Sequence, residues 1–384
     1  MQGERFIGLI SGTSRDGVEA VIAGDGGPIG WQVEAHLRYP YPDSVANELA
    51  RLTMAGHGHY QELGELDATI GEIFADAALA ILRETGTDPA TIRAIGSHGQ
   101  TLHHAPTAHP PFTWQIGDPF RIAERTGIDT VAFFRQRDIA AGGEGAPLAS
   151  ALHAACFASG SRTRAVINIG GISNITWLRP GKDVLGYDCG PGNTLMDTWI
   201  RTKRGLPFDS GGEWAAQGNI HAELLQTLRA DPFFALEPPK TTGPEYFSQH
   251  WLEQHMADVP PAHSQADVQA TLTEFTAGII ADAVLLDGKA GDDHCEVLVC
   301  GGGVHNTELM RRLRIRLGDV PLMETGDLGL PADQVEAAAF AWLARQTVTG
   351  REGNVPTVTG ARGPRILGCV IPGATPITSD RRQA

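Results

Sequence analysis

The sequence predicts an α/β protein built from a duplicated domain. Strand-like and helical stretches alternate along most of the chain, which is typical of this class. Three consecutive strand-like runs followed by helices occur once in each half. The first hairpin of each half also turns on glycine and hydroxyl residues, at 11–17 ("SGTSRDG") and 169–174 ("IGGISN"). We therefore expect two related domains with a cleft between them, which both turns face.

Composition limits the range of partners. The chain has 384 residues, 42% of them hydrophobic, which is enough for two cores. A formal net charge of −15 argues against nucleic acid or an anionic membrane as partner, because both require clustered cations. We found no apolar run approaching the ~20 residues that span a bilayer. Five cysteines without a CxxC pair indicate free thiols in a reducing compartment, so we expect a soluble, cytoplasmic protein.

The first half begins with short runs of apolar residues joined by glycine turns, and then a helix with apolar residues at three- and four-residue spacing. The elements predicted there are strands 5–11, 18–24 and 31–39, helices 43–55 and 59–86, strands 94–99 and 113–117, helix 118–127 and strand 129–134.

The second half follows a glycine-rich crossover at 138–148. Its predicted elements are helix 147–158, strands 164–171, 174–180 and 183–193, helices 191–204 and 210–229, a surface loop at 231–248, helix 266–288, strand 295–303, helix 306–316, strand 320–324 and a helix within 330–346. We place the first domain at 1–133 plus 351–384 and the second at 134–350.

The turn "SGTSRDG" combines small residues, hydroxyl groups and a carboxylate. Such a turn can hold a phosphate with its amides while the carboxylate holds Mg²⁺, usually through water. An ordinary turn has the same composition, and Arg15 would either contact the phosphate or point to solvent. The second, similar turn at 169–174 strengthens the phosphate interpretation.

A glycine run at 300–306, "CGGGVHN", follows a predicted strand and opens a helix. It resembles a dinucleotide fingerprint, but position 306 is Asn where the last glycine should be. A P-loop and a serine-hydrolase G-x-S-x-G motif are absent from the sequence. Contact with adenosine and a plain strand-to-helix turn therefore both remain open.

Two carboxylates are candidates for chemistry. Asp188 in "GYDCGPGNTLMD" is predicted at the end of a strand, where a partly desolvated carboxylate can take a proton from an attacking oxygen. The alternative is an aspartate that stabilises the turn before Asn193, a predicted helix cap. Glu336 adjoins the apolar face of the helix within 330–346 and would bind substrate hydroxyls or metal, or else be a solvated helix-start residue.

Motifs along nearly the whole chain resemble those of the anhydro-N-acetylmuramic acid kinase family, in the superfamily of sugar kinases and actin-like ATPases. They are "GLISGTSRDGVEA", "GSHGQTLHH", "QIGDPFRIAERTGI", "RQRDIAAGGEGAPL", "NIGGISNIT", "GYDCGPGNTLMDTW", "PPKTTGPEYF", "CGGGVHN", "EAAAFAWLA" and "NVPTVTGA". The resemblance implies duplicated actin-like (ribonuclease H-like) ATPase domains and a homodimer. It also implies that ATP and water convert a 1,6-anhydro sugar to N-acetylmuramic acid 6-phosphate in peptidoglycan recycling.

The resemblance assigns roles by position. Asp188 matches the general base, and Glu336 matches a position associated with the sugar. We expect Mg²⁺ at Asp16 and Asp188, and His98, Gln100 and Arg135 beside Glu336 at the sugar. The residues expected at ATP are Gly12, Thr13, Ser14, Arg15, Asp16, Gly17, Val18, Glu19, Gly170, Gly171, Asn174, Gly301, Gly302 and Gly303.

The sequence departs from the family pattern at a few positions. Phe133 stands where an acidic residue is usual, Pro244 replaces Arg, Arg15 replaces Leu or Met, and Glu19 replaces Asp. These differences bear on substrate affinity more than on the fold. Two alternatives therefore stay open: a kinase of a simpler anhydro sugar such as levoglucosan, and a nucleotide-binding regulator without sugar chemistry.

Overall fold

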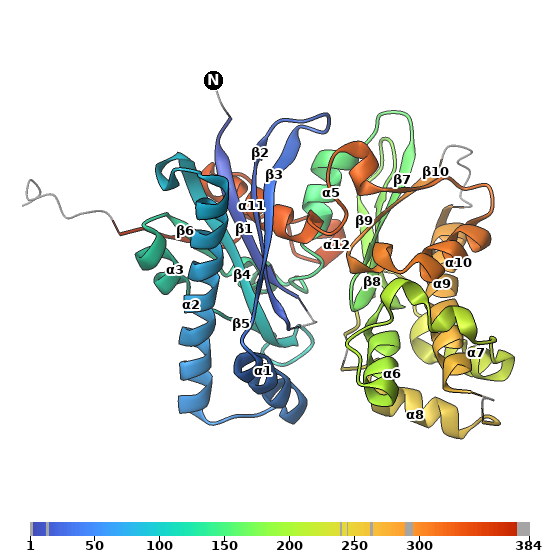
Figure 1. Cartoon of the computed structure of the whole chain (residues 1–384). Coiled ribbons are helices and arrows are strands. Elements are labelled where there is room, and N and C mark those ends of the chain that lie inside the picture. The colour runs from blue at the N-terminus through green and yellow to red at the C-terminus, as the bar shows by residue number, and fades with distance from the viewer. Residues whose placement is uncertain are drawn as a thin grey trace, which may run out of the picture. The chain divides into compact units, whose positions relative to one another are not determined.

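The structure is a computed structural model that describes residues 3–12, 15–238, 240–243, 245–261, 264–288 and 295–374. The chain forms two compact units (Figure 1). The first contains residues 1–152 and 336–384, and the second contains residues 153–335. The boundaries predicted from the sequence, after residues 133 and 350, differ from these by 19 and 15 residues.

The sheet of the first unit has the strand order β12-β6-β4-β1-β2-β3, and β5 pairs with β4. The pairs β1–β2 and β2–β3 are antiparallel, whereas β4 is parallel to β1, and β6 is parallel to β4. The strands are β1 (Arg5–Ser11), β2 (Gly17–Asp25), β3 (Trp31–Pro40), β4 (Ile92–Ala105), β5 (Phe112–Ile116), β6 (Thr130–Ala132) and β12 (Cys369–Ile371).

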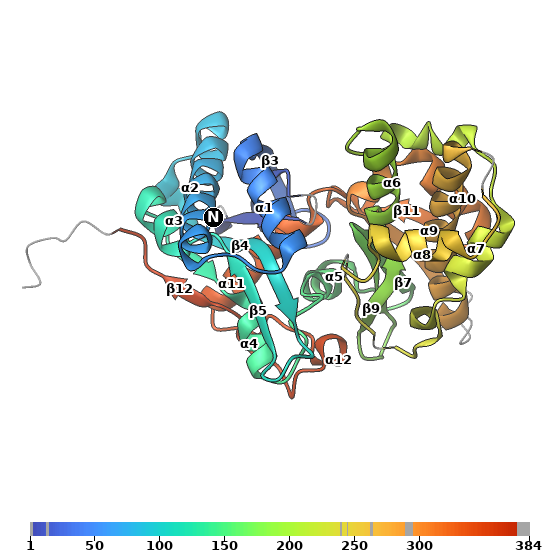
Figure 2. The same cartoon turned by 90° about the horizontal axis from the view of Figure 1, so that it is seen from below.

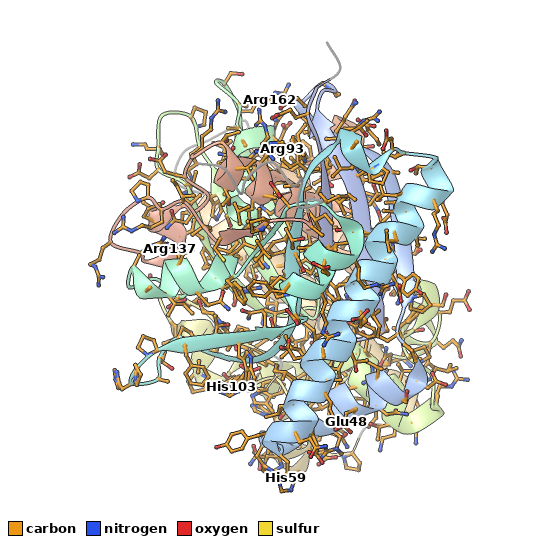
Figure 3. All side chains as sticks on the ribbon, turned by 90° about the vertical axis from the view of Figure 1, so that its left-hand side faces the viewer. Glu48, His59, Arg93, His103, Arg137 and Arg162 are labelled. Atoms are coloured by element: carbon orange, nitrogen blue, oxygen red, sulfur yellow. The ribbon has the colours of Figure 1, made fainter. Side chains whose placement is uncertain are left out.

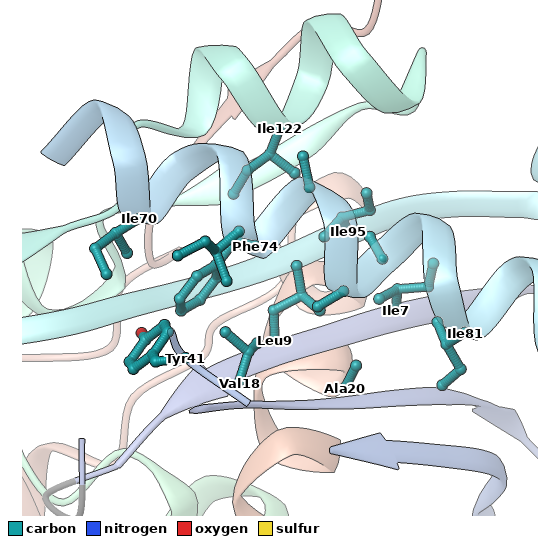
Figure 4. Packing of buried hydrophobic residues seen from close by; sticks show 14 of the residues in the cluster. Ile7, Leu9, Val18, Ala20, Tyr41, Ile70, Phe74, Ile81, Ile95 and Ile122 are labelled. Carbon is teal, nitrogen blue, oxygen red and sulfur yellow. The ribbon is translucent and has the colours of Figure 1, made fainter. Parts of the chain in front are cut away.

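One face of this sheet is covered by α1 (Asp43–Ala55), α2 (Tyr60–Thr85) and α3 (Pro119–Thr126). Alternate strand residues such as Ile7 and Leu9 of β1 point to these helices, as strand geometry requires. Figure 4 shows them packed against Phe74, which is fully buried in the centre of the cluster. The apolar spacing that predicted the helix at 59–86 is therefore the face that α2 buries.

The other face of the same sheet is covered by α11 (Val335–Val348), which the chain reaches only after the whole second unit. A Cβ at Gly8 would overlap the carbonyl oxygen of Ala337, and a Cβ at Gly96 would overlap that of Phe340. Glycine at these two positions lets the helix lie directly on the backbone of β1 and β4. Two short helices, α4 (Phe134–Ala140) and α12 (Pro356–Thr359), complete the unit.

The sheet of the second unit has the order β11-β10-β7-β8-β9. Again the first three strands form antiparallel pairs, β10 is parallel to β7, and β11 is parallel to β10. The strands are β7 (Thr163–Ile169), β8 (Ile172–Leu178), β9 (Leu185–Pro191), β10 (Cys295–Cys300) and β11 (Leu322–Glu324).

The helices of the second unit surround α9 (Gln265–Gly288), which packs against α6, α7, α10 and β9 (Figure 2). By length and composition alone, Gln265–Leu286 qualifies as a membrane span, which the sequence analysis did not anticipate. Its apolar window is 83% buried in the structure, so it is a core helix of this unit. The other helices of this unit are α6 (Thr194–Arg204), α7 (Ala222–Arg229), α8 (Gln249–Ala257) and α10 (Thr307–Leu317), whereas α5 (Ala149–Phe157) begins in the first unit and ends in the second.

The two sheets have the same strand order and directions: β6-β4-β1-β2-β3 corresponds to β11-β10-β7-β8-β9. This repeat confirms the predicted α/β fold built from a duplicated domain. It also explains why two similar glycine turns occur half a chain apart: each joins the first two strands of its sheet.

Several local predictions were wrong. The predicted helix 210–229 is two short 3-10 turns followed by α7, because Asp209 accepts the backbone N–H groups of Trp214 and Ala215 and so interrupts it. The predicted surface loop 231–248 buries Phe233 and Phe247 and leads into α8, which was not predicted. The helix predicted within 330–346 is Val335–Val348, so it ends two residues beyond that range. Helix α4 and strand β12 were also missed.

Replacing Gly8 with alanine should lower the free energy of unfolding, by about 1–3 kcal/mol or more, because the added methyl group overlaps the backbone of α11. Gly64→Ala is the matched control: Gly64 is exposed within α2, with nothing near an added Cβ, and should gain about 0.5–1 kcal/mol. Urea unfolding of both variants measures the difference. Equal stability of Gly8→Ala and wild type would contradict the packing described here.

Candidate functional site

The turn between β1 and β2 leaves Gly12 exposed, with no atom within 4 Å of where a Cβ would stand. The Arg15 backbone N–H donates to the Gly12 carbonyl at 3.3 Å, and Arg15 has a left-handed φ of 54°. Thr13 and Ser14 lie outside the described residues. The open side of Gly12 suits the close approach of a ligand to backbone amides.

Only part of the predicted ATP segment Gly12–Glu19 belongs to this turn. Gly17, Val18 and Glu19 lie in β2, and the Val18 side chain is fully buried in the core, so only its backbone is available to a ligand. Asp16, the predicted metal ligand, is exposed and forms an ion pair with Arg38. Arg38 lies opposite Glu19 in the β2–β3 register, and its Nε is 3.5 Å from Glu19 Oε1.

Gln100 is buried and holds the end of β1. Its Oε1 accepts the Ser11 hydroxyl at 2.7 Å, and its Nε2 donates to the Gly12 carbonyl at 3.4 Å. Because both ends of the amide bind the protein, Gln100 fixes the position of the Gly12 turn. This places a predicted sugar residue next to the predicted phosphate turn.

His98 and Arg135, also predicted at the sugar, contact each other. The Arg135 Nε–H donates to His98 Nε2 at 2.9 Å, and His98 Nδ1 is 3.0 Å from the Gly99 carbonyl oxygen. Burial and then the nearby guanidinium lower the pKa of His98 well below its ordinary value. The ring is therefore neutral, with the proton on Nδ1 and Nε2 free to accept from Arg135.

A buried carboxylate supports Arg135 from behind. Arg135 Nη1 donates to the Gly145 carbonyl at 2.9 Å, and the Gly145 N–H donates to Asp138 Oδ2 at 2.8 Å. Asp138 has no exposed surface, and its Oδ1 accepts Asn354 Nδ2 and the Thr359 hydroxyl, each at 2.8 Å. The segment at 354–359 thus fixes the loop that orients Arg135, which the sequence analysis did not foresee.

In the second unit, the glycine turn between β7 and β8 binds the start of α6. The carbonyl of Gly170 accepts the Asn193 N–H at 2.8 Å, and that of Gly171 accepts the Gly192 N–H at 2.8 Å. Asn193 stands at the helix N-cap as predicted, but its side chain donates to the Ile169 carbonyl and does not cap the helix. Hydrogen bonds from the segment that follows β9 therefore hold the turn in place.

Gly301, Gly302 and Gly303 follow β10, next to this turn. A Cβ at Gly301 would overlap Asn168 Oδ1, and one at Gly303 would overlap the Ile169 side chain, so both pack on the end of β7. Gly302 is exposed with nothing within 4 Å of an added Cβ. The predicted nucleotide residues of this unit thus gather at the carboxyl ends of two parallel strands, where open α/β sheets bind ligands.

Asp188 lies in the middle of β9 and not at a strand end, because pairing with β8 continues through Pro191. It is 8% exposed and sits opposite Asn174, a predicted ATP residue. Its Oδ2 accepts the Thr242 N–H at 2.9 Å, and its own N–H donates to the Lys240 carbonyl at 2.9 Å. The carboxylate is thus partly desolvated and oriented, as a general base requires.

Glu336 is exposed in the first turn of α11, in contrast to the buried environment considered from the sequence. Across the described residues, no group of three or more His, Cys, Asp or Glu side chains has the arrangement of a metal site. Cys156, Cys189 and Cys300 are buried free thiols as expected, but Cys369 is exposed.

Comparison with known proteins decides the family. The family model described as anhydro-N-acetylmuramic acid kinase matches residues 4–373. The chain belongs to the anhydro-N-acetylmuramic acid kinase family.

Relatives in this family cover almost the whole chain. The anhydro-N-acetylmuramic acid kinase of Xanthomonas oryzae pv. oryzae (strain MAFF 311018) is 47% identical over 96% of this chain and 97% of its own length. That of Variovorax paradoxus (strain S110) is 47% identical over 97% of this chain and 100% of its own length. Among solved structures, the activator of the 2-hydroxyisocaproyl-CoA dehydratase from Clostridium difficile covers 90% of this chain and 96% of its own, at 10% identity and a TM-score of 0.45.

Changing His98 to Gln should flatten the pH dependence of stability in this kinase-family chain. The folded protein keeps His98 neutral, whereas the unfolded chain takes up a proton below about pH 6.5. The stabilisation from His98 is therefore present above that pH and is lost as the pH falls. Between pH 6.5 and 5, the wild-type free energy of unfolding should fall faster than that of His98→Gln, by up to ~1.4 kcal/mol per pH unit. Urea unfolding across this range measures both slopes, and equal slopes would refute the neutral state of His98.

Proposed function

We propose that this protein uses ATP and water to open 1,6-anhydro-N-acetylmuramic acid and phosphorylate it at the sixth position, in peptidoglycan recycling. Membership of the kinase family supports the reaction class. The observation that carries the mechanism is Asp188, a nearly buried carboxylate whose backbone and Oδ2 are both held by hydrogen bonds.

Asp188 would take a proton from the water molecule that attacks the anomeric carbon. The bond from that carbon to the bridging oxygen then breaks, and the released oxygen attacks the γ-phosphoryl group of ATP. The bond between the γ-phosphorus and the β–γ bridging oxygen breaks, and ADP leaves. The proton stays on Asp188 until it is passed to solvent. A nearly buried carboxylate that hydrogen bonds hold in one orientation suits this role.

The open backbone at Gly12 and Gly302 fits phosphate binding, because a side chain at either position would fill the space in front of its amide. Gly170 also has no closer atom than 3.5 Å to an added Cβ. We propose that these glycines, with Thr13, Ser14, Gly171, Asn174, Gly301 and Gly303, bind ATP.

Mg²⁺ would be held mainly by phosphate oxygens, with Asp16 or Asp188 contacting it through water. Bound there, it would neutralise charge that develops on the phosphoryl group. Asp16 must then share its carboxylate between the ion and Arg38.

Arg135 is the cation we assign to the lactyl carboxylate of the sugar. Its guanidinium is fixed by His98 and the Gly145 carbonyl, which pre-organises it for a planar anion. Arg137, a second arginine on the same helix α4, is exposed (Figure 3). We also propose that the enzyme acts as a homodimer in the cytoplasm, as the family resemblance implies.

A coupled ADP-release assay with two sugars tests this function. Turnover of anhydro-N-acetylmuramic acid supports it. Turnover of levoglucosan alone would favour the kinase of a simpler anhydro sugar. Turnover of neither sugar would favour a nucleotide-binding regulator.

Asp188→Asn should keep the fold and ATP binding but lower kcat by about 10²–10⁴-fold, because the amide cannot accept the proton. Asp183→Asn, two residues before β9 on the exposed connection, is the matched control and should retain wild-type turnover. ADP release gives kcat, and calorimetric titration with ATP gives the binding constant. Wild-type kcat in Asp188→Asn would show that another group is the base.

Arg135→Met should raise the KM for anhydro-N-acetylmuramic acid by about 10–100-fold, the range expected for loss of a charge-assisted hydrogen bond. The KM for levoglucosan, which lacks the lactyl group, should change far less in any residual turnover. Arg137→Met serves as the control on the same helix and should stay within about twofold of wild type. Equal losses for both sugars would assign Arg135 a purely structural role.

A further inference from the structure

The segment 240–243, which we name the base clasp, forms two hydrogen bonds with Asp188 from neighbouring positions. Lys240 accepts the Asp188 N–H through its carbonyl at 2.9 Å, and the Thr242 N–H donates to Asp188 Oδ2 at 2.9 Å. We propose that the Thr242 backbone N–H positions the general base for the reaction. This inference rests on the proposed function of Asp188.

The place of Asp188 explains why such a device is needed. Strand β9 is at the edge of its sheet, so within the described part of the chain one side of its backbone has no neighbouring strand. The base clasp covers that side at Lys240, and two residues further on it reaches the carboxylate. A bond to the main chain and a bond to the side chain of one residue together fix both its backbone and its carboxylate plane. In other pairs of a nucleophile and a base, a third group likewise holds the base in its orientation.

The base clasp is anchored at both ends in a cluster of aromatic rings. Lys240 Nζ donates to the Phe233 carbonyl at 3.3 Å and lies 4.8 Å from the centre of the Phe233 ring. At the other end, the Gly243 carbonyl accepts the N–H groups of Tyr246 at 3.1 Å and Phe247 at 3.3 Å. Phe247 is fully buried and packs edge-on against Phe233 and Trp251.

A buried carboxylate ties this anchor together. Asp231 is 7% exposed and accepts three hydrogen bonds: from the Phe233 N–H at 2.9 Å, the Tyr246 hydroxyl at 2.9 Å and Trp251 Nε1 at 2.8 Å. These donors come from both sides of the base clasp and from α8. The segment predicted as a surface loop is therefore fixed at its ends while its middle holds Asp188.

The base clasp borders a cavity at its first residue, Lys240. A cavity of about 320 Å³ lies behind it, lined by Tyr187 and Cys189, the neighbours of Asp188 in β9, and by Lys240 and residues 234–238. Lys240 therefore has room to shift on that side. The hydrogen bonds to Asp188 then set the distance between the base clasp and the carboxylate. They also set the orientation of the carboxylate.

Thr242→Pro tests the proposal because proline lacks the N–H that Asp188 accepts. We expect kcat to fall by about 10–100-fold, as for other residues that orient a reactive group through a hydrogen bond. The KM for ATP should stay within twofold. Thr242→Ala keeps the N–H and should lose less than threefold, so the pair separates the backbone donor from the side chain. A folded Thr242→Pro variant with wild-type kcat overturns the proposal.

Two further measurements decide the remaining cases. If Thr242→Pro does not fold, Tyr246→Phe removes one hydrogen bond from the Asp231 anchor and should lower kcat by about 3–10-fold with the KM for ATP unchanged. Wild-type kcat in that variant then overturns the proposal. If the wild type turns over neither sugar, the proposed function fails, and crystal structures still test the geometry. In Thr242→Ala, we expect the Asp188 carboxylate to stay near the backbone nitrogen of residue 242. In Thr242→Pro, we expect the carboxylate to turn away from it. An unchanged carboxylate position in Thr242→Pro would refute the role of the base clasp.

Discussion

The first unit depends on the close contact between α11 and the backbone of β1 and β4. That contact exists because Gly8 and Gly96 lack side chains, so helix and sheet meet backbone to backbone. The helix belongs to a segment that the chain reaches only after the entire second unit. The N-terminal residues alone therefore leave one face of their sheet uncovered, and the first unit is complete only when both segments are present. The same returning segment supplies Asn354 and Thr359 to the Asp138 carboxylate, which joins the stability of this unit to the position of Arg135.

Much of the fold could be predicted because its signals are local. Leu66, Ile70 and Phe74 recur at helical spacing, and glycine turns separate the short β runs, so helix, strand and duplication were legible in the sequence. The segment 231–248 was not, because its prolines and glycine resemble a loop. What makes it structure is distant: Asp231 binds Trp251 twenty residues away, and Phe234 packs on Phe275. Helix α4 was missed for a different reason, since Phe133, in a left-handed conformation with no capping side chain, precedes it.

In the candidate site, too, features that follow from local sequence signals could be predicted, whereas features that depend on contacts between distant residues could not. The gathering of Gly170, Gly171 and Gly301–Gly303 follows from two parallel strands that end side by side, which motif order and strand prediction suffice to suggest. No sequence pattern indicated that Arg38 would take Asp16, because that pairing depends on the β2–β3 register. Nor did any pattern link Thr242 to Asp188, residues 54 apart whose contact involves a backbone N–H that every residue except proline has. Side-chain chemistry can be read from a sequence, but the main-chain groups that orient it cannot.

The neutral state of His98 has a consequence for the proposed recognition of the sugar carboxylate by Arg135. A protonated ring would present two N–H donors, lose the acceptor that holds Arg135 Nε and place two cations in contact, so protonation and correct placement of Arg135 exclude each other. Burial resolves this in favour of the neutral ring. A sugar carboxylate is ionised above about pH 4 and arginine is charged throughout, so both partners keep their charges across the working pH range. The His98 ring, which orients the guanidinium, therefore keeps its protonation state over the same pH range as the proposed ion pair. A lysine at position 135 lacks the planar guanidinium and would not be oriented in the same way.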